Sequence, residues 1–324
     1  MAADPAPGSE APLISIPEAP APRGGRAEWI EGSGGVRLRA ALFPADGEPR
    51  GSVVLSPGRT EPIEKYFEVV ADLTGRGFVV LAHDWRGQGL SGRLLSDPMR
   101  GHAEGFAGYL DDHRTLLDAF SSRLPQPWIA LGHSMGGALE LLALARGETR
   151  FAAAFLSAPM LAIATRPWPP WLALRIVQLS GRLGRSREYA LPPYDPAGDR
   201  FAFDRLTHDR ARYERYKAQL RACPELAIGA LTWGWLDFAL SAGAALAAEG
   251  ALEAVQIPVS IVAAGQDHLV LNAVDQTAAR RLPHGRYLEI AGAFHEILME
   301  TDAVRAQVWA AFDELAGEAI SRPA

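Results

Sequence analysis

Short apolar runs alternate with amphipathic stretches along most of the chain. The runs have the length and apolar content of buried strands, and they occur at 51–56, 78–82, 128–131, 151–157, 259–264 and 287–290. Helical patterns occupy the stretches between and after them, at 63–76, 106–124, 138–145, 274–282 and 302–315. Strands that alternate with helices of this length predict a mostly parallel, doubly wound α/β sheet with helices on both faces. Residues 36–43 instead alternate apolar and polar positions, which is typical of an exposed edge strand.

One long segment breaks this alternation. Residues 160–250 are helical and irregular, and Trp, Pro and Arg cluster in them. A segment of this length exceeds an ordinary loop, and an insertion after the carboxyl end of a strand lies where open α/β sheets bind ligands. We therefore predict one sheet domain made of 26–159 and 251–324, with 160–250 inserted as a helical cap, or lid, over its binding site.

Composition narrows the class of protein. Residues 1–25 are rich in Ala, Pro and Glu and lack the basic start and apolar run of a secretory signal, so we expect a disordered tail. No segment has the ~20 apolar residues of a membrane span. A net charge of −6 without a basic stripe argues against nucleic-acid binding. The single cysteine, Cys223, suits a reducing compartment. We expect a cytoplasmic protein, a location compatible with peripheral contact at the inner face of a membrane.

The most informative motif is Gly132-His133-Ser134-Met135-Gly136, which fits the G-x-S-x-G nucleophile elbow. The apolar run 128–131 precedes it and the helical stretch 138–145 follows it, as the motif requires. A serine on a sharp strand-to-helix turn projects its hydroxyl out of the sheet, and the glycines leave room for that turn. We predict Ser134 as a catalytic nucleophile.

A serine nucleophile needs a base that a carboxylate orients, and elbow enzymes supply them in the chain order Ser, Asp or Glu, His. Asp267 directly follows the strand 259–264, and His295 follows the last strand, so both loops open on the same edge of the sheet as Ser134. We predict these three residues as a catalytic triad. The alternatives for the base are His268 and His284, and the alternative for the acid is Glu289.

An acyl-transfer site also needs two N–H donors for the oxyanion. One is the backbone N–H of Met135, the residue after the nucleophile. The other is expected from the loop after the strand 51–56, where the backbone N–H of Arg59 is the best candidate. The alternative interpretation of this loop is an ordinary Pro-Gly turn.

These residues together resemble the α/β-hydrolase superfamily, and more closely its bacterial lysophospholipases and monoacylglycerol lipases. The passages that carry the resemblance are 57–66, the D-x-R-G-x-G-x-S turn at 84–91, the elbow at 132–137 and the histidine loop at 295–300. Within the inserted segment, 206–210 and 229–235 resemble the lysophospholipase branch. The resemblance implies a serine esterase that acts on a single-chain lipid without a metal or organic cofactor. Pro57-Gly58 departs from the His-Gly of many relatives.

The inserted segment holds the candidate substrate contacts. We expect Trp168, Trp171, Trp233 and Trp235 to line an apolar groove for the lipid chain. Arg182, Arg185 and Arg187 are candidates for attracting a phosphate head group. A prolyl-type aminopeptidase would use the same core but would need acidic cap residues. A non-catalytic binding protein on the same fold is the other alternative. The head group, acyl length and oligomeric state stay open at this point.

Overall fold

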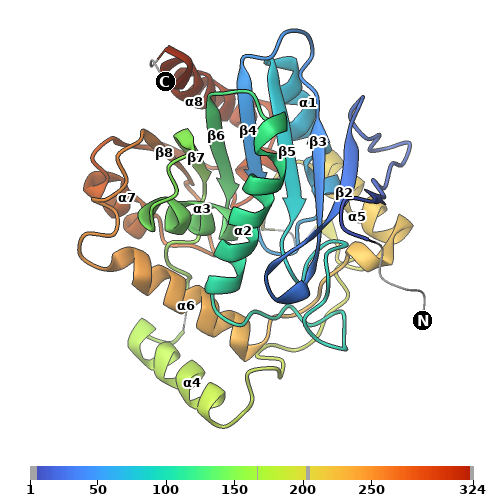
Figure 1. The fold of residues 1–324 in the computed structure, drawn as a ribbon. Helices are drawn as coiled ribbons and strands as arrows, with labels where there is room; N and C mark the ends of the chain where they lie inside the picture. The colour runs from blue at the N-terminus through green and yellow to red at the C-terminus, as the bar shows by residue number, and fades with distance from the viewer. Residues whose placement is uncertain (1–5, 166, 202–204, 322–324) are drawn as a thin grey trace.

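Nine strands form one sheet in the computed structural model, which describes residues 6–165, 167–201 and 205–321 (Figure 1). The remaining residues, among them 1–5 of the predicted tail and Arg166 of the predicted cap, lie outside the described residues. The strands are β1 (Glu10–Ala11), β2 (Arg26–Glu31), β3 (Arg37–Phe43), β4 (Gly51–Ser56), β5 (Phe78–Asp84), β6 (Trp128–His133), β7 (Phe151–Ser157), β8 (Val259–Ala264) and β9 (Gly285–Ile290).

The sheet has the order β1-β2-β3-β5-β4-β6-β7-β8-β9. The six neighbouring strands β5, β4, β6, β7, β8 and β9 run parallel to one another, while β1, β2 and β3 pair antiparallel at one edge of the sheet. This arrangement confirms the predicted α/β class. The carboxyl ends of the parallel strands meet at one edge of the sheet, where ligands bind in such folds.

Helices cover both faces of the sheet. They are α1 (Phe67–Gly75), α2 (Ala107–Phe120), α3 (Met135–Ala145), α4 (Pro170–Arg182), α5 (Arg210–Ala222), α6 (Trp233–Ala247), α7 (Asn272–Arg281) and α8 (Asp302–Ser321). One core cluster joins α2, α3, α6 and α7 to one face, and a second joins α1 and α8 to the other. None of the helices in the described ranges is long and apolar enough to cross a bilayer.

Two expectations about the N-terminal part were wrong. The segment 36–43 is not an exposed edge, because β2 covers the outer side of β3 and Leu38 and Ala41 are fully buried. Residues 6–25 are not a disordered tail, because β1 pairs with β2 and Ala11 lies in the core. The physical reason is a set of long-range backbone contacts that composition does not reveal. The Arg39 guanidinium donates to the Pro12 carbonyl at 3.0 Å and holds this segment against the sheet.

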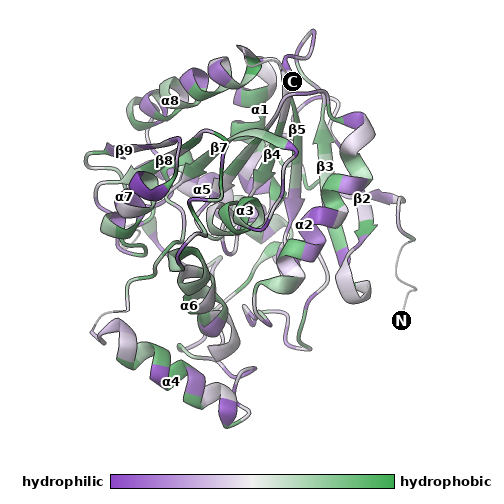
Figure 2. Ribbon diagram, turned by 60° about the vertical axis from the view of Figure 1, so that its left-hand side comes forward, coloured by the Kyte–Doolittle hydropathy of each residue, from purple (hydrophilic) through white to green (hydrophobic). Residues whose placement is uncertain are grey.

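The segment between β7 and β8 contains α4, α5 and α6, and it does not stand apart from the sheet domain. Helix α6 packs on α3, and its Phe238 and Ala242 belong to the main core. Helix α4 packs on α6 and lies at the periphery, with α6 between it and the sheet (Figure 2). The segment therefore contributes residues to the hydrophobic core and residues to the surface. Its irregular sequence pattern does not show which residues belong to which.

Candidate active site

Ser134 lies on a strained turn between β6 and α3. Its φ of 50° and ψ of −114° are a conformation that residues other than glycine rarely adopt. The flanking glycines are required by close backbone contacts. A Cβ on Gly136 would lie 2.1 Å from the carbonyl oxygen of Ser56, and one on Gly132 would lie 2.7 Å from the Cα of Gly137. The sequence 132–137 therefore folds as the sharp turn that its motif predicts.

The structure brings Ser134, His295 and Asp267 together from three loops at the carboxyl edge of the sheet. His295 Nε2 lies 2.9 Å from Ser134 Oγ, and His295 Nδ1 lies 2.6 Å from Asp267 Oδ2. His295 is only 4% exposed. A serine, a histidine and a carboxylate in this contact can generate a nucleophile and shuttle its proton.

The environment of Asp267 favours its charged form. Burial alone would raise its pKa, but the hydrogen bond from His295 and the backbone N–H groups of Val270 and Leu269 outweigh burial and lower it. The two backbone donors lie 3.0 and 2.8 Å from Asp267 Oδ1. A carboxylate at Asp267 keeps the proton of His295 on Nδ1, so that Nε2 is free to accept the Ser134 proton.

The loop after β4 approaches the elbow, as expected for an oxyanion site. Within the described ranges, the backbone N–H groups of Arg59 and Met135 donate to no other backbone group. The preceding N–H, of Gly58, donates to Glu61 Oε2 at 2.6 Å. Glu61 is in turn ion-paired with Lys65 at 2.7 Å, so the loop is fixed by buried charges. Of the two residues predicted to supply oxyanion donors, Arg59 lines the same cavity as Ser134, and Met135 directly follows Ser134 at the start of α3.

A mostly apolar cavity of about 720 Å³ opens above Ser134 and His295. The inserted segment supplies most of its apolar wall, including Ile163, Pro167, Trp168, Ala173, Ile176, Val177, Leu191, Leu231, Trp233, Trp235, Leu236 and Leu240. The loop after β4 supplies Gly58, Arg59, Thr60 and Glu61 on another side. A cavity of this size and lining suits an extended apolar ligand.

Three of the four predicted tryptophans line this cavity, but Trp171 does not. Its side chain is 66% exposed and lies on the outer face of α4, whereas Ala173 and Ile176 of the same helix face inward. The predicted arginines are also outside the cavity lining. Arg185 is paired with Glu188 at 2.7 Å, and Arg187 with Glu104 at 3.3 Å. Sequence spacing could not identify the inner face of α4, because both faces carry apolar residues.

The alternative acid Glu289 and the alternative bases His268 and His284 occupy other positions, and His284 is exposed in the turn before β9. Glu289 accepts a hydrogen bond from the Tyr287 hydroxyl at 2.7 Å on the outermost strand β9. His268 lines the cavity beside Phe294, with 6.0 Å between the centroids of the two rings. The histidine that contacts Ser134 is His295. His133 packs near His295 and donates from Nδ1 to the Ser157 carbonyl at 3.0 Å. Burial lowers the pKa of His133 to about 4, which keeps it neutral.

The positively charged side chain of Arg59 in this cavity is the feature that sequence analysis did not predict. The sequence motifs point to Arg59 by its backbone alone, yet its side chain also lines the cavity. Its position directly after Pro57-Gly58 in the loop at a strand end was the available signal. Among the described residues, no group of three or more His, Cys, Asp or Glu is arranged to hold a metal ion.

Comparisons with known proteins agree with this fold. The family model described as serine aminopeptidase, S33 matches residues 47–302. Lysophospholipase L2 of Escherichia coli (strain K12) is 36% identical over 283 residues, which cover 83% of this chain and 81% of that protein. Monoacylglycerol lipase of Mycolicibacterium smegmatis is 36% identical over 129 residues, covering 40% of this chain and 44% of the lipase.

Solved structures extend the comparison to the whole fold. A soluble variant of monoglyceride lipase from Saccharomyces cerevisiae, in complex with a substrate analogue, superposes with a TM-score of 0.72 at 18% identity. The superposition covers 96% of this chain and 100% of that chain. The sheet order, the elbow and the family match together confirm the predicted α/β-hydrolase resemblance, and the chain belongs to the serine aminopeptidase S33 family, with similarity to lysophospholipase L2 over most of its length.

Proposed function

We propose that this chain is a serine hydrolase that cleaves the carboxylic ester of a single-chain lipid, a lysophospholipid or a monoacylglycerol. The observation that carries the proposal is the hydrogen-bonded series Ser134, His295 and Asp267 at an apolar cavity of about 720 Å³. Similarity to lysophospholipase L2 over most of the chain and to a monoacylglycerol lipase over part of it supports the same substrate class.

In the proposed reaction, Ser134 Oγ attacks the ester carbonyl while His295 Nε2 accepts its proton. The charge on the tetrahedral oxygen is stabilised by the backbone N–H groups of Arg59 and Met135. Asp267 stabilises the imidazolium, which then donates its proton to the leaving alcohol. Water, deprotonated by His295, hydrolyses the acyl-enzyme and releases the fatty acid.

The inserted residues 160–250 serve, in this proposal, as a cap that shields the lipid chain from water. Their side chains supply most of the apolar wall of the cavity, while the sheet domain supplies Ser134 and His295. Burial of apolar surface gives about 25 cal/mol per Å², so such a wall favours a long acyl chain over a short one.

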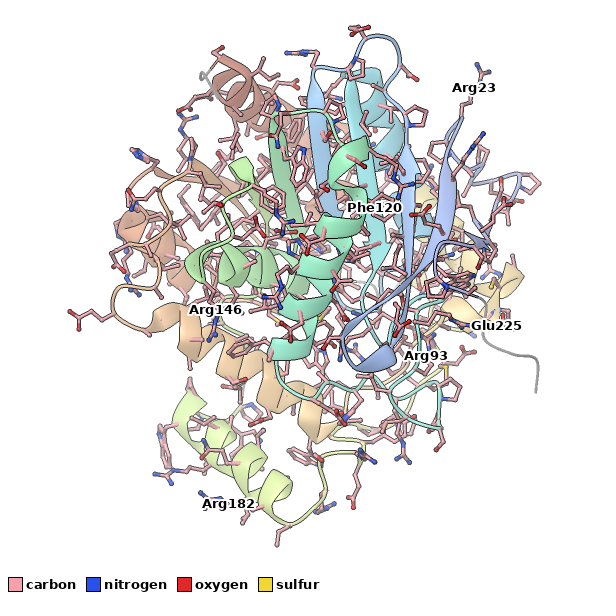
Figure 3. The ribbon with its side chains drawn as sticks, viewed as in Figure 1. Arg23, Arg93, Phe120, Arg146, Arg182 and Glu225 are labelled. Atoms are coloured by element: carbon pink, nitrogen blue, oxygen red, sulfur yellow. The ribbon has the colours of Figure 1, made fainter. Side chains whose placement is uncertain are left out.

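The outer face of α4 is suited to contact with a lipid surface. Trp171 and Leu179 are exposed on it, and Leu183 follows at the end of the helix. Arg175 and Arg182 lie on the same exposed side, and α4 contains no acidic residue. Figure 3 shows Arg182 pointing away from the rest of the molecule. Tryptophan and leucine beside arginine fit the boundary of an anionic membrane, so we propose peripheral docking through α4.

The main alternative is an aminopeptidase, which the description of the family model names. Such an enzyme needs a free carboxylate for the substrate's ammonium group. The cavity contains Glu61 and Glu296, but both bind Lys65, at 2.7 and 2.6 Å. Their charge is therefore already engaged, which favours the ester hydrolase.

The test compares wild type with Ser134→Ala. A fluorophosphonate probe should label the wild type only, and fatty-acid release from lauroyl lysophosphatidylcholine or monolauroylglycerol should fall by at least ~10³-fold in the variant. Amino-acid and prolyl nitroanilides should be turned over far more slowly than either lipid. Equal turnover by the two proteins would refute the assignment of Ser134, and faster cleavage of the amides would favour the aminopeptidase.

A further inference from the structure

The Arg59 side chain places a positive charge in the cavity above Ser134. Its Nη2 donates to the Gly229 carbonyl at 2.5 Å, and its guanidinium lies 5.3 Å from the centre of the Trp235 ring. Its Nε is buried and has no hydrogen-bond partner within the described part of the chain. Burial lowers the pKa of Arg59, and Tyr194 is the neighbour that most opposes this shift. The guanidinium nevertheless stays charged, as arginine does in proteins.

The arginines that are buried in the described part of the chain, Arg39 and Arg305, are neutralised by carboxylates. Arg39 pairs with Glu64 and Asp84, both at 2.7 Å, and Arg305 pairs with Glu68 at 2.7 Å. Among the described residues, no carboxylate forms an ion pair with Arg59. After burial itself, the side chains that act most strongly on its pKa are tyrosines, with Tyr194 first. Arg59 is half-buried at the cavity wall, and a charge that is partly removed from water without a carboxylate partner among the described residues suits a site for an anion.

The acidic groups of the same cavity do not supply that anion. Glu61 and Glu296 both pair with Lys65, whose side chain lies between them. Glu61 also accepts hydrogen bonds from the Gly58 N–H at 2.6 Å and from the Tyr66 hydroxyl at 2.5 Å. The two carboxylates are thus committed to the Lys65 cluster, and the Arg59 guanidinium, whose neighbours are the Gly229 carbonyl and the Tyr194 side chain, keeps a positive charge that an incoming anion can neutralise.

We propose that the Arg59 side chain binds the phosphate of a lysophospholipid head group, and so makes this site selective for phosphate-bearing lipids over monoacylglycerols. The inference rests on the proposed ester hydrolase function, and it names the substrate class within it. A guanidinium binds phosphate oxygens with two parallel N–H groups, which a tyrosine or tryptophan wall cannot do.

The position of Arg59 matches the shape of such a lipid. Its backbone N–H is the proposed donor to the ester oxyanion, and its side chain extends from the same residue along the cavity wall. In a lysophospholipid, the glycerol carbons separate the ester from the phosphate by a distance comparable to the length of an arginine side chain. One residue can therefore contact the ester with its backbone and the phosphate with its side chain, which leaves the apolar wall for the acyl chain.

The experiment uses the full chain and two lipids with the same acyl group, lauroyl lysophosphatidylcholine and monolauroylglycerol. We expect Arg59→Met to lower the ratio of kcat/KM for the lysophospholipid to kcat/KM for the monoacylglycerol by about tenfold or more, as loss of a charge-assisted contact does. Arg59→Lys should restore part of the ratio. The matched control is Arg93→Met. Arg93, labelled in Figure 3, also ties the inserted segment to the sheet domain, through the carbonyls of Glu225 and Ala227, but it is not one of the residues that line the cavity.

Binding measurements with lipids that cannot be hydrolysed test this inference separately from the proposed function. Ser134→Ala should bind an ether lysophospholipid, which has no ester, about tenfold more tightly than the matching alkylglycerol, and Arg59→Met should remove that difference. Inorganic phosphate should bind far more weakly than the ether lipid. An unchanged kcat/KM ratio, or equal binding of the two ether lipids to the protein with Arg59, would overturn the inference. Inorganic phosphate that binds as tightly as the ether lysophospholipid would also overturn the inference, because it would show that the site does not recognise the lipid. Absence of turnover of both esters by the wild type would instead refute the proposed function.

Discussion

The Ser56 hydroxyl donates a hydrogen bond of 2.5 Å to the Glu140 carboxylate, and this bond joins the strand before the proposed oxyanion loop to the helix after the proposed nucleophile. Glu140 is fully buried, and His113 Nε2 lies 3.0 Å from the same carboxylate oxygen. Two segments that must keep a fixed distance for catalysis are therefore connected beneath the site.

Removing this carboxylate should destabilise the protein and loosen the site. We expect Glu140→Ala to lower the free energy of unfolding by about 3 kcal/mol, because its buried partners lose their acceptor. Urea unfolding curves measure this change. Ser56→Ala removes one donor only and should cost about 1 kcal/mol. A Glu140→Ala variant as stable as wild type would mean that the contact contributes nothing.

A second prediction concerns the close approach between α3 and the loop after β4. Gly136→Ala should abolish esterase activity and lower the melting temperature, because the new Cβ would lie 2.1 Å from the Ser56 carbonyl oxygen and 2.6 Å from that of Pro57. Gly181→Ala in α4 is the matched control, since nothing lies within 4 Å of its added Cβ. Replacing a helical glycine there should be neutral or stabilise by up to about 1 kcal/mol. Similar behaviour of the two variants in thermal unfolding and ester turnover would contradict the tight packing of the turn at Ser134.

A third prediction tests the role proposed for Asp267. Asp267→Asn keeps the shape of the side chain but no longer favours the Nδ1–H form of His295, so kcat should fall by about 10³ to 10⁴-fold at neutral pH. Initial rates on a soluble nitrophenyl ester measure the loss. Glu289→Gln is the control, because Glu289 is the alternative acid and lies on β9 with Tyr287 as its partner. A larger loss in the Glu289 variant would reverse the assignment.

Asp275 gives a fourth prediction, on stability against pH. Its carboxyl group is fully buried in α7, and neither oxygen has a hydrogen-bond partner among the described residues. Burial, followed by the nearby charge of Asp267, raises its pKa from 3.8 to about 8. The folded protein therefore binds this proton more tightly than the unfolded chain does. The stability it contributes is fully present below pH 3.8 and is lost as the pH rises to about 8.

Asp275→Asn mimics the protonated form and should remove this dependence. We expect the variant to be more stable than wild type at pH 8, by on the order of 3 kcal/mol, and to differ little from it at pH 4. Urea midpoints at the two pH values measure the effect. A wild type that gains stability from Asp275 as the pH rises would contradict the direction of the pKa shift.

Much of the candidate site could be predicted because each of its residues follows a strand. Ser134, Asp267 and His295 lie at the ends of apolar runs or in the loops that follow them, and parallel strands end at the same edge, so the order of strands and loops brings the three together. The position of Trp171 could not be predicted in this way. Helix α4 carries apolar residues on both faces, and only packing on α6 decides which face turns inward.

Long-range contacts account for the other differences. The segment 6–25 has the composition of a tail, yet the Ile14 N–H donates to Glu64 at 3.0 Å and Arg39 binds the neighbouring Pro12 carbonyl. The role of the Arg59 charge could not be predicted from the sequence for a similar reason. The sequence context of Arg59 explains its backbone, whereas its lack of a carboxylate partner among the described residues depends on tertiary packing, in which Lys65 binds both glutamates of the same cavity. Such contacts join residues far apart in the chain, and local patterns carry no signal for them.

The exposed face of α4 leads to the last prediction. If this face docks on a membrane, Trp171→Ala combined with Leu183→Ala should weaken binding to vesicles of phosphatidylglycerol and phosphatidylcholine by about tenfold or more, since two exposed apolar side chains no longer insert. Arg182→Glu should weaken binding to these anionic vesicles and have a smaller effect on purely zwitterionic ones. Leu288→Ala, which removes an exposed leucine on β9, is the control. Vesicle co-sedimentation measures all four proteins. Equal binding by the double variant and the Leu288 control would place the lipid contact elsewhere, because the docking proposal depends on the exposed Trp171 of α4 and on Leu183 directly after the helix.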